Sequence, residues 1–178
     1  MPLIQTIDPS EATGELANLY AMIEKMGRTV GNNAKLFSIS PEILRQQLDF
    51  IKHYMNHPTL SMPLLAAIRI MVSGAEECQF CVDYNTAMLI NLAGWREDQV
   101  SAMRKDPASA NLPKREKAML LLVIKAIRNA HGVSANDLDV LREMGWEDRD
   151  IFDAVNHAAR MLSTDILFNA FRIEDYRG

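Results

Sequence analysis

The sequence predicts an all-α protein, and three observations support this prediction. Apolar residues recur at the three-to-four-residue spacing of a buried helix face along most of the chain. No stretch alternates apolar and polar residues with the period of two that is typical of a half-buried strand. A unit that comprises two helices and a Gly-Trp pair occurs twice, which indicates that helical hairpins are the building block.

The predicted helices begin at proline or capping signals. The first opens at Asp8-Pro9-Ser10-Glu11, ends at Gly27, and carries an apolar stripe along one face. The next segments are assigned by the same signals: Ser40-Pro41-Glu42 to His57-Pro58, Met62-Pro63 to about Gly74, the two cysteines to Gly94, Leu112-Pro113 to about Ala130, a helix capped by Ser134-Ala135-Asn136-Asp137, and about Asp148 to Phe171.

The internal repeat relates two segments of nearly equal length. The helix that begins at Pro63 corresponds to the one that begins at Pro113, and Gly94-Trp95 corresponds to Gly145-Trp146. In each copy the glycine suits a left-handed helix end, and the tryptophan is expected to pack back over it. The second copy has Asn129-Ala130-His131-Gly132 where the first has its cysteines, so only the first copy is expected to carry chemistry.

The composition favours one globular domain. The 178 residues predict a single domain over 1–178, with a helical arm at 1–32, a cysteine-bearing repeat at 63–100 and a second repeat at 113–151. A net charge of -4 argues against a nucleic-acid partner. The absence of an 18-residue apolar run argues against a membrane partner, and the absence of a signal-peptide pattern predicts a cytoplasmic location.

The two cysteines are the main candidates for chemistry. Cys78 and Cys81 form a C-x-x-C pair at a predicted helix start, where free N–H groups favour a thiolate. A disulfide across so short a loop removes little chain entropy, so the pair indicates redox chemistry or metal binding rather than stabilisation. Asn85 lies one turn after Cys81 on the same face, and two roles are predicted for it: its amide donates a hydrogen bond to the Cys81 sulfur, or the residue is a packing or surface asparagine.

Two other interpretations of the cysteines remain open. They can be small buried apolar residues without a chemical role. They can also bind structural zinc together with His53 and His57, although His57 precedes Pro58 at a helix end, where regular helical spacing is doubtful.

A longer motif surrounds the cysteines. Glu77-Cys78-Gln79-Phe80-Cys81-Val82-Asp83-Tyr84-Asn85 follows the helix that starts at Pro63 and precedes Gly94, and Asn33-Ala34-Lys35-Leu36-Phe37 and Pro41-Glu42-Ile43-Leu44 extend the motif upstream. This arrangement resembles the C-x-x-C-containing branch of the alkylhydroperoxidase AhpD-like / carboxymuconolactone decarboxylase family. The resemblance covers roughly residues 30 to 178.

The resemblance implies an AhpD-like all-α fold and a thiol-dependent peroxidase or disulfide oxidoreductase that reduces hydrogen peroxide or small organic hydroperoxides. In such enzymes the second cysteine, here Cys81, attacks the peroxide, and the first, here Cys78, resolves the sulfenic acid as a disulfide. A thiol, a lipoylated protein or a thioredoxin-like protein supplies the electrons. No bound cofactor is implied.

The resemblance also implies a homo-oligomer, often a trimer or hexamer. Two predicted helices are apolar on more than one side, which points the same way. The residues concerned are Leu89, Ile90, Leu92 and Ala93 in one helix and Leu120, Leu121 and Val123 in the other.

The chain departs from the family's proton relay at two positions. Asn85 replaces the histidine that commonly follows the second cysteine by one turn, and Ala66 replaces a glutamate upstream of the first cysteine. Activity is therefore expected to be weak unless Arg69, His131 or His157 supplies a cation or a base. The alternative functions are a redox-responsive or scaffolding protein of the same fold without efficient turnover, and a structural zinc protein.

Overall fold

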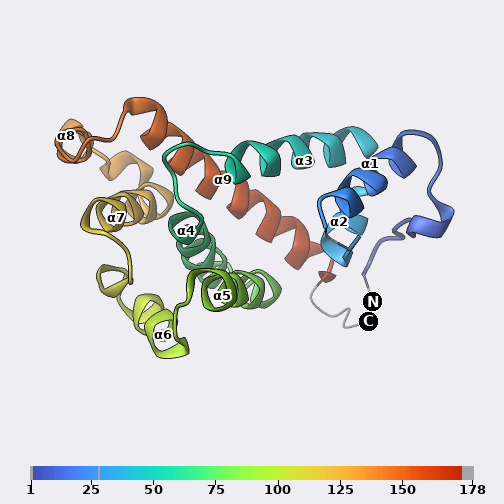
Figure 1. Cartoon of the computed structure of the whole chain (residues 1–178), viewed down its shortest axis with the longest axis horizontal. Helices are drawn as coiled ribbons and strands as arrows, with labels where there is room; N and C mark the ends of the chain where they lie inside the picture. Colours follow the sequence, from blue (N-terminus) through green and yellow to red (C-terminus); the bar gives the residue numbers. More distant parts are fainter. Residues whose placement is uncertain (1, 28, 174–178) are drawn as a thin grey trace. The chain divides into compact units, whose positions relative to one another are not determined.

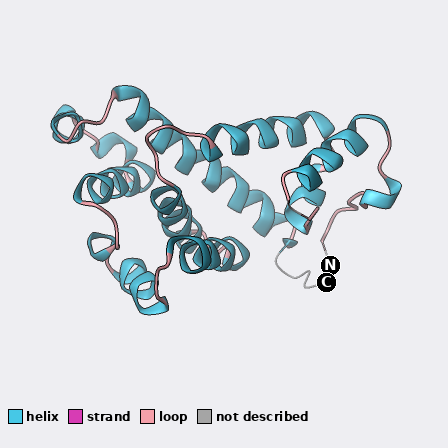
Figure 2. Ribbon diagram, viewed as in Figure 1, coloured by secondary structure: helices cyan, strands magenta, loops and turns pink. Residues whose placement is uncertain are grey.

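The computed structural model describes residues 2–27 and 29–173, and all of the regular structure in these two ranges is helical (Figures 1 and 2). The predicted all-α class is therefore confirmed. The helices are α1 (Gly14–Lys25), α2 (Asn32–Phe37), α3 (Pro41–Met55), α4 (Met62–Ala75), α5 (Gln79–Ala93), α6 (Glu97–Lys105), α7 (Lys114–Arg128), α8 (Ala135–Glu143) and α9 (Asp148–Ala170). Short 3₁₀ turns span Pro9–Glu11, Pro107–Ser109 and Ala130–Gly132.

The chain divides into two compact units. The first comprises residues 1–56 and 167–178, and the second comprises residues 57–166. Both predicted repeats, 63–100 and 113–151, lie in the second unit. No helix in the described ranges is both long enough and apolar enough to cross a membrane.

The first unit buries one face of α1 against α3. The predicted apolar stripe of α1 is buried and packs with two leucines of α3; the residues are Leu16, Leu19, Tyr20, Ile23, Leu44 and Leu48. The predicted start of this helix at Asp8 is wrong, because Ala12 is extended and Gly14 has a positive φ of 57°. The Asp8 carboxylate pairs with Lys35 instead of capping a helix. Helix α2 has no predicted counterpart, since its six residues are too few to show a helical period.

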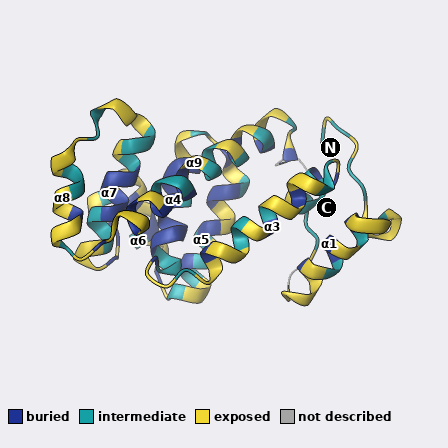
Figure 3. Cartoon of the chain, turned by 90° about the horizontal axis from the view of Figure 1, so that it is seen from above, coloured by how far each residue is buried: buried dark blue, intermediate teal, exposed yellow. Residues whose placement is uncertain are grey.

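Helix α4 is the centre of the second unit. It packs against α5 and α7, and its buried positions occupy almost its whole circumference (Figure 3). A helix that is apolar on every side gains stability only when other elements surround it. Helix α4 is enclosed in this way, and α5 begins four residues after its end, at the segment that carries the cysteines.

The repeated Gly-Trp pairs end α5 and α8 in the same way. Gly94 and Gly145 have positive φ values of 69° and 82°, which only glycine adopts without strain. The N–H groups of Trp95 and Trp146 donate to carbonyls near the ends of the two helices at 3.0 and 3.1 Å. Both indole rings are buried, as the repeat predicts. The two copies are therefore alike in their helix ends.

Candidate active site

The turn between α4 and α5 fixes the backbone of the cysteine pair. Glu77 adopts a left-handed conformation with φ 57°, which is unfavourable for a residue with a side chain. This conformation lets the Cys78 N–H donate to the Ser73 carbonyl at 2.9 Å, while the Cys78 carbonyl accepts from Val82 in the first turn of α5. Cys78 therefore stands at the N-cap of α5, as the sequence predicts.

The two thiols are free and buried. Cys78 is completely inaccessible and Cys81 is 3% exposed. Their sulfur atoms lie within 4.8 Å of each other and of a carboxylate oxygen of Asp165. The site thus holds three ionisable groups that are almost completely buried.

Asp165 is the member of this cluster that the sequence motif does not reveal. It comes from α9 and is completely buried. Its Oδ1 accepts a hydrogen bond from the Ser73 hydroxyl at 3.0 Å, while Oδ2 accepts none from the N–H and O–H groups of the described residues. An aspartate is rarely buried with an oxygen that no N–H or O–H group reaches, because the loss of hydration costs free energy. Such residues mark candidate functional sites.

A signal for Asp165 is present in the sequence. The buried residues Ala154, Ala158 and Phe168 of α9 recur at helical spacing, and Asp165 falls on the same stripe. An acidic residue on an otherwise apolar stripe indicates a buried carboxylate, which is a candidate functional group because charged side chains are seldom fully buried. The stripe alone does not say which partner the carboxylate meets, because that depends on how α9 packs.

The surroundings keep the Cys81 thiol protonated. A hydrogen bond with Cys78, burial, and the negative charge of Asp165 all raise the pKa of Cys81 above its usual range. The expected stabilisation of a thiolate at the helix start is therefore outweighed in the resting site. Burial also raises the pKa of Asp165, although hydrogen bonds from Cys81, Ser73 and Cys78 oppose this shift and the charge of Glu76 adds to it.

Asn85 lies in the site but does not bond to the sulfur. Its amide donates to the backbone carbonyl of Cys81 at 2.8 Å, so the predicted bond to the Cys81 thiol is wrong. The carbonyl one turn earlier is the nearest acceptor that a helical asparagine reaches. The Asn85 side-chain oxygen in turn accepts from the Nε of Arg69. Asn85 thus connects the first turn of α5 to α4.

Arg69 and His157 continue this chain of polar contacts. The Arg69 Nη1 lies 3.1 Å from Nε2 of His157, and Nη2 lies 3.8 Å from the Met88 sulfur. An arginine always donates, so Nε2 of His157 is the acceptor and its proton is on Nδ1. Burial and the nearby charge of Arg69 lower the pKa of His157 well below its usual value, so this histidine is neutral at pH 7.

The remaining relay candidates lie elsewhere. Ala66, where the family resemblance implies a glutamate, is completely buried in α4 and offers no proton acceptor. His131 is exposed in the 3₁₀ turn after α7. Of the described residues, Asp165 is therefore the carboxylate that the fold brings to the cysteines.

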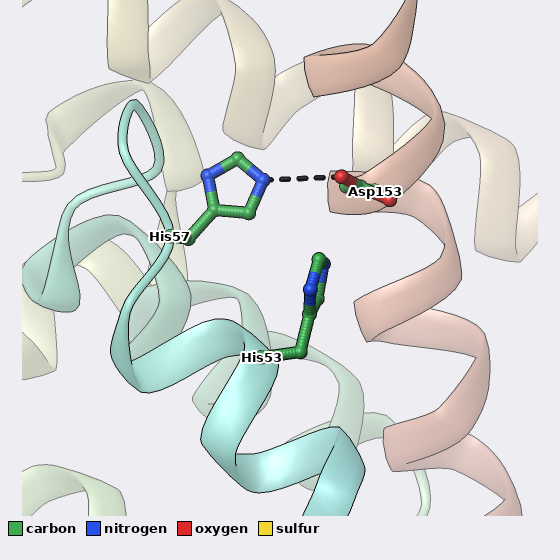
Figure 4. Close-up of side chains that lie close together, drawn as sticks. All are labelled: His53, His57 and Asp153. Atoms are coloured by element: carbon green, nitrogen blue, oxygen red, sulfur yellow. Dashed lines mark hydrogen bonds and ion pairs between the residues drawn. The ribbon is translucent and has the colours of Figure 1, made fainter.

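His57 serves another part of the second unit. Its Nδ1 accepts the backbone N–H of Leu60 at 3.0 Å, and its Nε2 lies 3.1 Å from a carboxylate oxygen of Asp153 (Figure 4). In the described part of the chain the two cysteines are grouped with Asp165 and not with His57. The predicted zinc site of two histidines and two cysteines is therefore not assembled, and two thiols with one carboxylate fall short of the four ligands of a structural zinc site.

Comparison with solved structures finds close structural neighbours. An uncharacterized peroxidase-related protein from Silicibacter sp. TM1040 superposes with a TM-score of 0.80 at 24% identity, over 96% of this chain and 88% of that chain. The alkylhydroperoxidase AhpD core of an uncharacterized peroxidase-related protein from Ralstonia eutropha JMP134 gives a TM-score of 0.82 at 19% identity, over 97% and 90% of the two chains. No family model matches the sequence, and no curated protein matches it significantly. The helices in residues 2–27 and 29–173 therefore have the AhpD-like all-α fold.

Proposed function

We propose that this protein is a thiol-dependent peroxidase or disulfide oxidoreductase that reduces hydrogen peroxide or a small organic hydroperoxide through Cys81 and Cys78. One observation carries the proposal: two free thiols lie at the start of one helix, close to each other and to a buried carboxylate. The fold, which the chain shares with peroxidase-related proteins, is consistent with it. Because both thiols are buried, we expect the substrate to be a small oxidant.

The proposed reaction has two steps at the protein. The Cys81 thiolate attacks one peroxide oxygen and the O–O bond breaks, which leaves a sulfenic acid on Cys81 and an alkoxide or hydroxide that takes up the proton lost by the thiol. The Cys78 thiolate then attacks the Cys81 sulfur, which forms the disulfide and expels hydroxide, and the proton from the Cys78 thiol converts this hydroxide to water. An external dithiol, such as a lipoylated or thioredoxin-like protein, donates two electrons and restores both thiols.

The proposal is tested by the loss of free thiols after one equivalent of hydrogen peroxide is added to the reduced protein. Wild type should lose both thiols, Cys78→Ser should stop at a sulfenic acid, and Cys81→Ser should remain inert. The two serine variants are matched controls, because each removes one sulfur and keeps the other. Thiol loss in wild type that is no faster than that of free cysteine would refute the proposed function.

The raised pKa of Cys81 favours a second candidate, a redox-responsive protein that is oxidised once and turns over slowly. Steady-state consumption of peroxide with excess dihydrolipoamide distinguishes the two functions. An enzyme consumes many equivalents per subunit, whereas a sensor consumes one and stops.

A further inference from the structure

The chemistry at Cys81 needs a group that moves a proton. A thiol becomes a nucleophile only after it loses its proton, and the oxygen that leaves the peroxide must gain one. The family positions hold Asn85 and Ala66, and neither side chain is able to exchange a proton near neutral pH. Asn85 is moreover bonded to the Cys81 carbonyl and to Arg69.

Asp165 has the position that this role requires. A carboxylate oxygen of Asp165 lies within 4.8 Å of both sulfurs. The residue is completely buried, with an exposure of 0%. The Ser73 hydroxyl occupies Oδ1 and holds the carboxylate in one orientation. Oδ2 is left without a partner among the N–H and O–H groups of the described residues, which leaves it available for a thiol proton.

We propose that Asp165 is the proton shuttle of the site, taking the proton from the Cys81 thiol and delivering it to the oxygen that leaves the peroxide. This inference rests on the proposed function. In the first step the carboxylate gains the thiol proton, sulfur bonds to oxygen, the O–O bond breaks, and the proton passes to the leaving alkoxide or hydroxide. In the second step Asp165 takes the Cys78 proton and gives it to the hydroxide that leaves the sulfenic acid.

The charges around Asp165 are consistent with a base. The titratable groups that act on it are Cys78 and Cys81 at the start of α5 and Glu76 in the turn before it. Burial and the Glu76 charge raise the pKa of Asp165, so its carboxylate holds a proton more strongly than an exposed aspartate does. A base whose pKa is closer to that of the thiol transfers a proton between the two with a smaller penalty.

The test compares two reagents for the same thiol, in the whole protein with chelator present. Hydrogen peroxide has a leaving oxygen that needs a proton, whereas iodoacetamide releases iodide, which needs none. The measured quantity is the rate ratio, which is the rate constant of Cys81 with peroxide divided by its rate constant with iodoacetamide. In Asp165→Asn this rate ratio should fall about 100-fold at pH 7. The wild-type peroxide rate should be nearly independent of pH between the titrations of Asp165 and Cys81, while the variant rate should rise about tenfold per pH unit.

Other roles of Asp165 give different results. If Asp165 acts only through its charge, Asp165→Asn speeds both reactions equally, because removal of a negative charge lowers the pKa of the neighbouring thiol. If Asp165 only maintains the structure, both reactions change by the same factor. Either result overturns the proposal, as does an unchanged rate ratio.

Two further variants complete the experiment. Asp153→Asn removes another buried carboxylate of α9, one that pairs with His57, and should leave the rate ratio as in wild type. Ser73→Ala should lower the ratio by less than Asp165→Asn, since Ser73 only orients the carboxylate. A wild-type protein that is inert toward peroxide refutes the proposed function itself, whereas a reactive wild type with an unaffected Asp165→Asn variant refutes the shuttle alone.

Discussion

At the scale of single residues, the site concentrates groups that do not favour burial. Asp165 loses its hydration and receives in exchange hydrogen bonds only from neutral groups, the Ser73 hydroxyl and the two thiols. Cys81 and Cys78 do not offset its charge, because the thiols are neutral when the carboxylate is ionised. A buried charge of this kind lowers the free energy of unfolding, and the loss is measurable.

We predict that Asp165→Asn stabilises the protein at neutral pH by about 1–3 kcal/mol. Burial raises the pKa of Asp165 in the folded protein. Its contribution to stability is therefore present below pH 3.9, about the pKa of an aspartate in the unfolded chain, and is lost as the pH rises through the pKa of Asp165 in the folded protein. The asparagine keeps an acceptor for Ser73 and carries no charge. Urea unfolding at pH 4 and pH 7.5 measures the difference, which should be larger at the higher pH. A variant that is less stable than wild type at both pH values contradicts this account.

At the scale of elements, the turn from α4 to α5 determines where the thiols lie. Glu77 is exposed and left-handed, a conformation that costs about 1 kcal/mol or more for a residue with a Cβ. The bond between the Cys78 N–H and the Ser73 carbonyl holds the turn in this conformation. Backbone strain is thus located one residue before the first cysteine of the C-x-x-C pair.

We predict that Glu77→Gly stabilises the protein by about 0.5–1 kcal/mol, because glycine adopts positive φ without a steric penalty. Glu77→Gln is the matched control, since it removes the same charge and keeps the Cβ. Thermal unfolding of both variants measures the effect. If the glutamine variant gains as much stability as the glycine variant, charge and not backbone conformation is responsible.

The contact between Arg69 of α4 and His157 of α9 adds a second pH-dependent contribution to the free energy of unfolding. Burial lowers the pKa of His157 well below 6.5, so its contribution to stability is present above pH 6.5 and is lost as pH falls toward the folded value. We predict that wild type loses about 1.4 kcal/mol per pH unit through this group below about pH 6. His157→Gln, which keeps an acceptor for Arg69, should lose less.

Urea unfolding of wild type and His157→Gln at pH 5 and pH 7.5 checks this prediction. Contributions of Asp165 are common to both proteins and cancel in the comparison. Equal pH dependence in the two proteins would show that His157 does not titrate differently on unfolding.

At the scale of the whole molecule, the apolar surface bears on assembly. Leu89, Leu120 and Val123, which suggested an extra apolar face, are buried within the chain itself. Leu92 and Leu121 of the same helices are 69% and 41% exposed. On α9, Phe152 and Ile166 are 70% and 55% exposed. Large exposed apolar side chains of this kind often mark interfaces.

We therefore predict a homo-oligomer at micromolar concentration, with the trimer or hexamer that the family resemblance implies as the expected size. Light scattering coupled to size exclusion measures the molar mass, and Leu92→Ser and Phe152→Ser, made separately, should lower it if each side chain lies in an interface. A 20.1 kDa species for wild type would refute this prediction. Retained helicity in far-UV circular dichroism shows that the variants remain folded.

Local signals in the sequence account for most of the fold. Proline and serine starts, glycine ends and apolar stripes specify α3 to α5 and α7 to α9 within a few residues, because these signals depend only on neighbouring backbone. They fail at Asp8, where a proline start yields only a 3₁₀ turn before Gly14. They also miss α2, which is shorter than two helical turns.

The candidate site is likewise predictable from the sequence only where its geometry is local. Cys78 and Cys81 are predictable from the sequence as a pair one turn apart at the start of a helix, since a spacing of three residues along α5 sets that geometry. The sequence by itself did not determine that Asp165 meets them, or that Asn85 turns to the Cys81 carbonyl and Arg69. Those contacts join α5 to α4 and α9, and such long-range contacts depend on how entire helix faces pack. The tertiary structure alone decided which carboxylate lies beside the thiols.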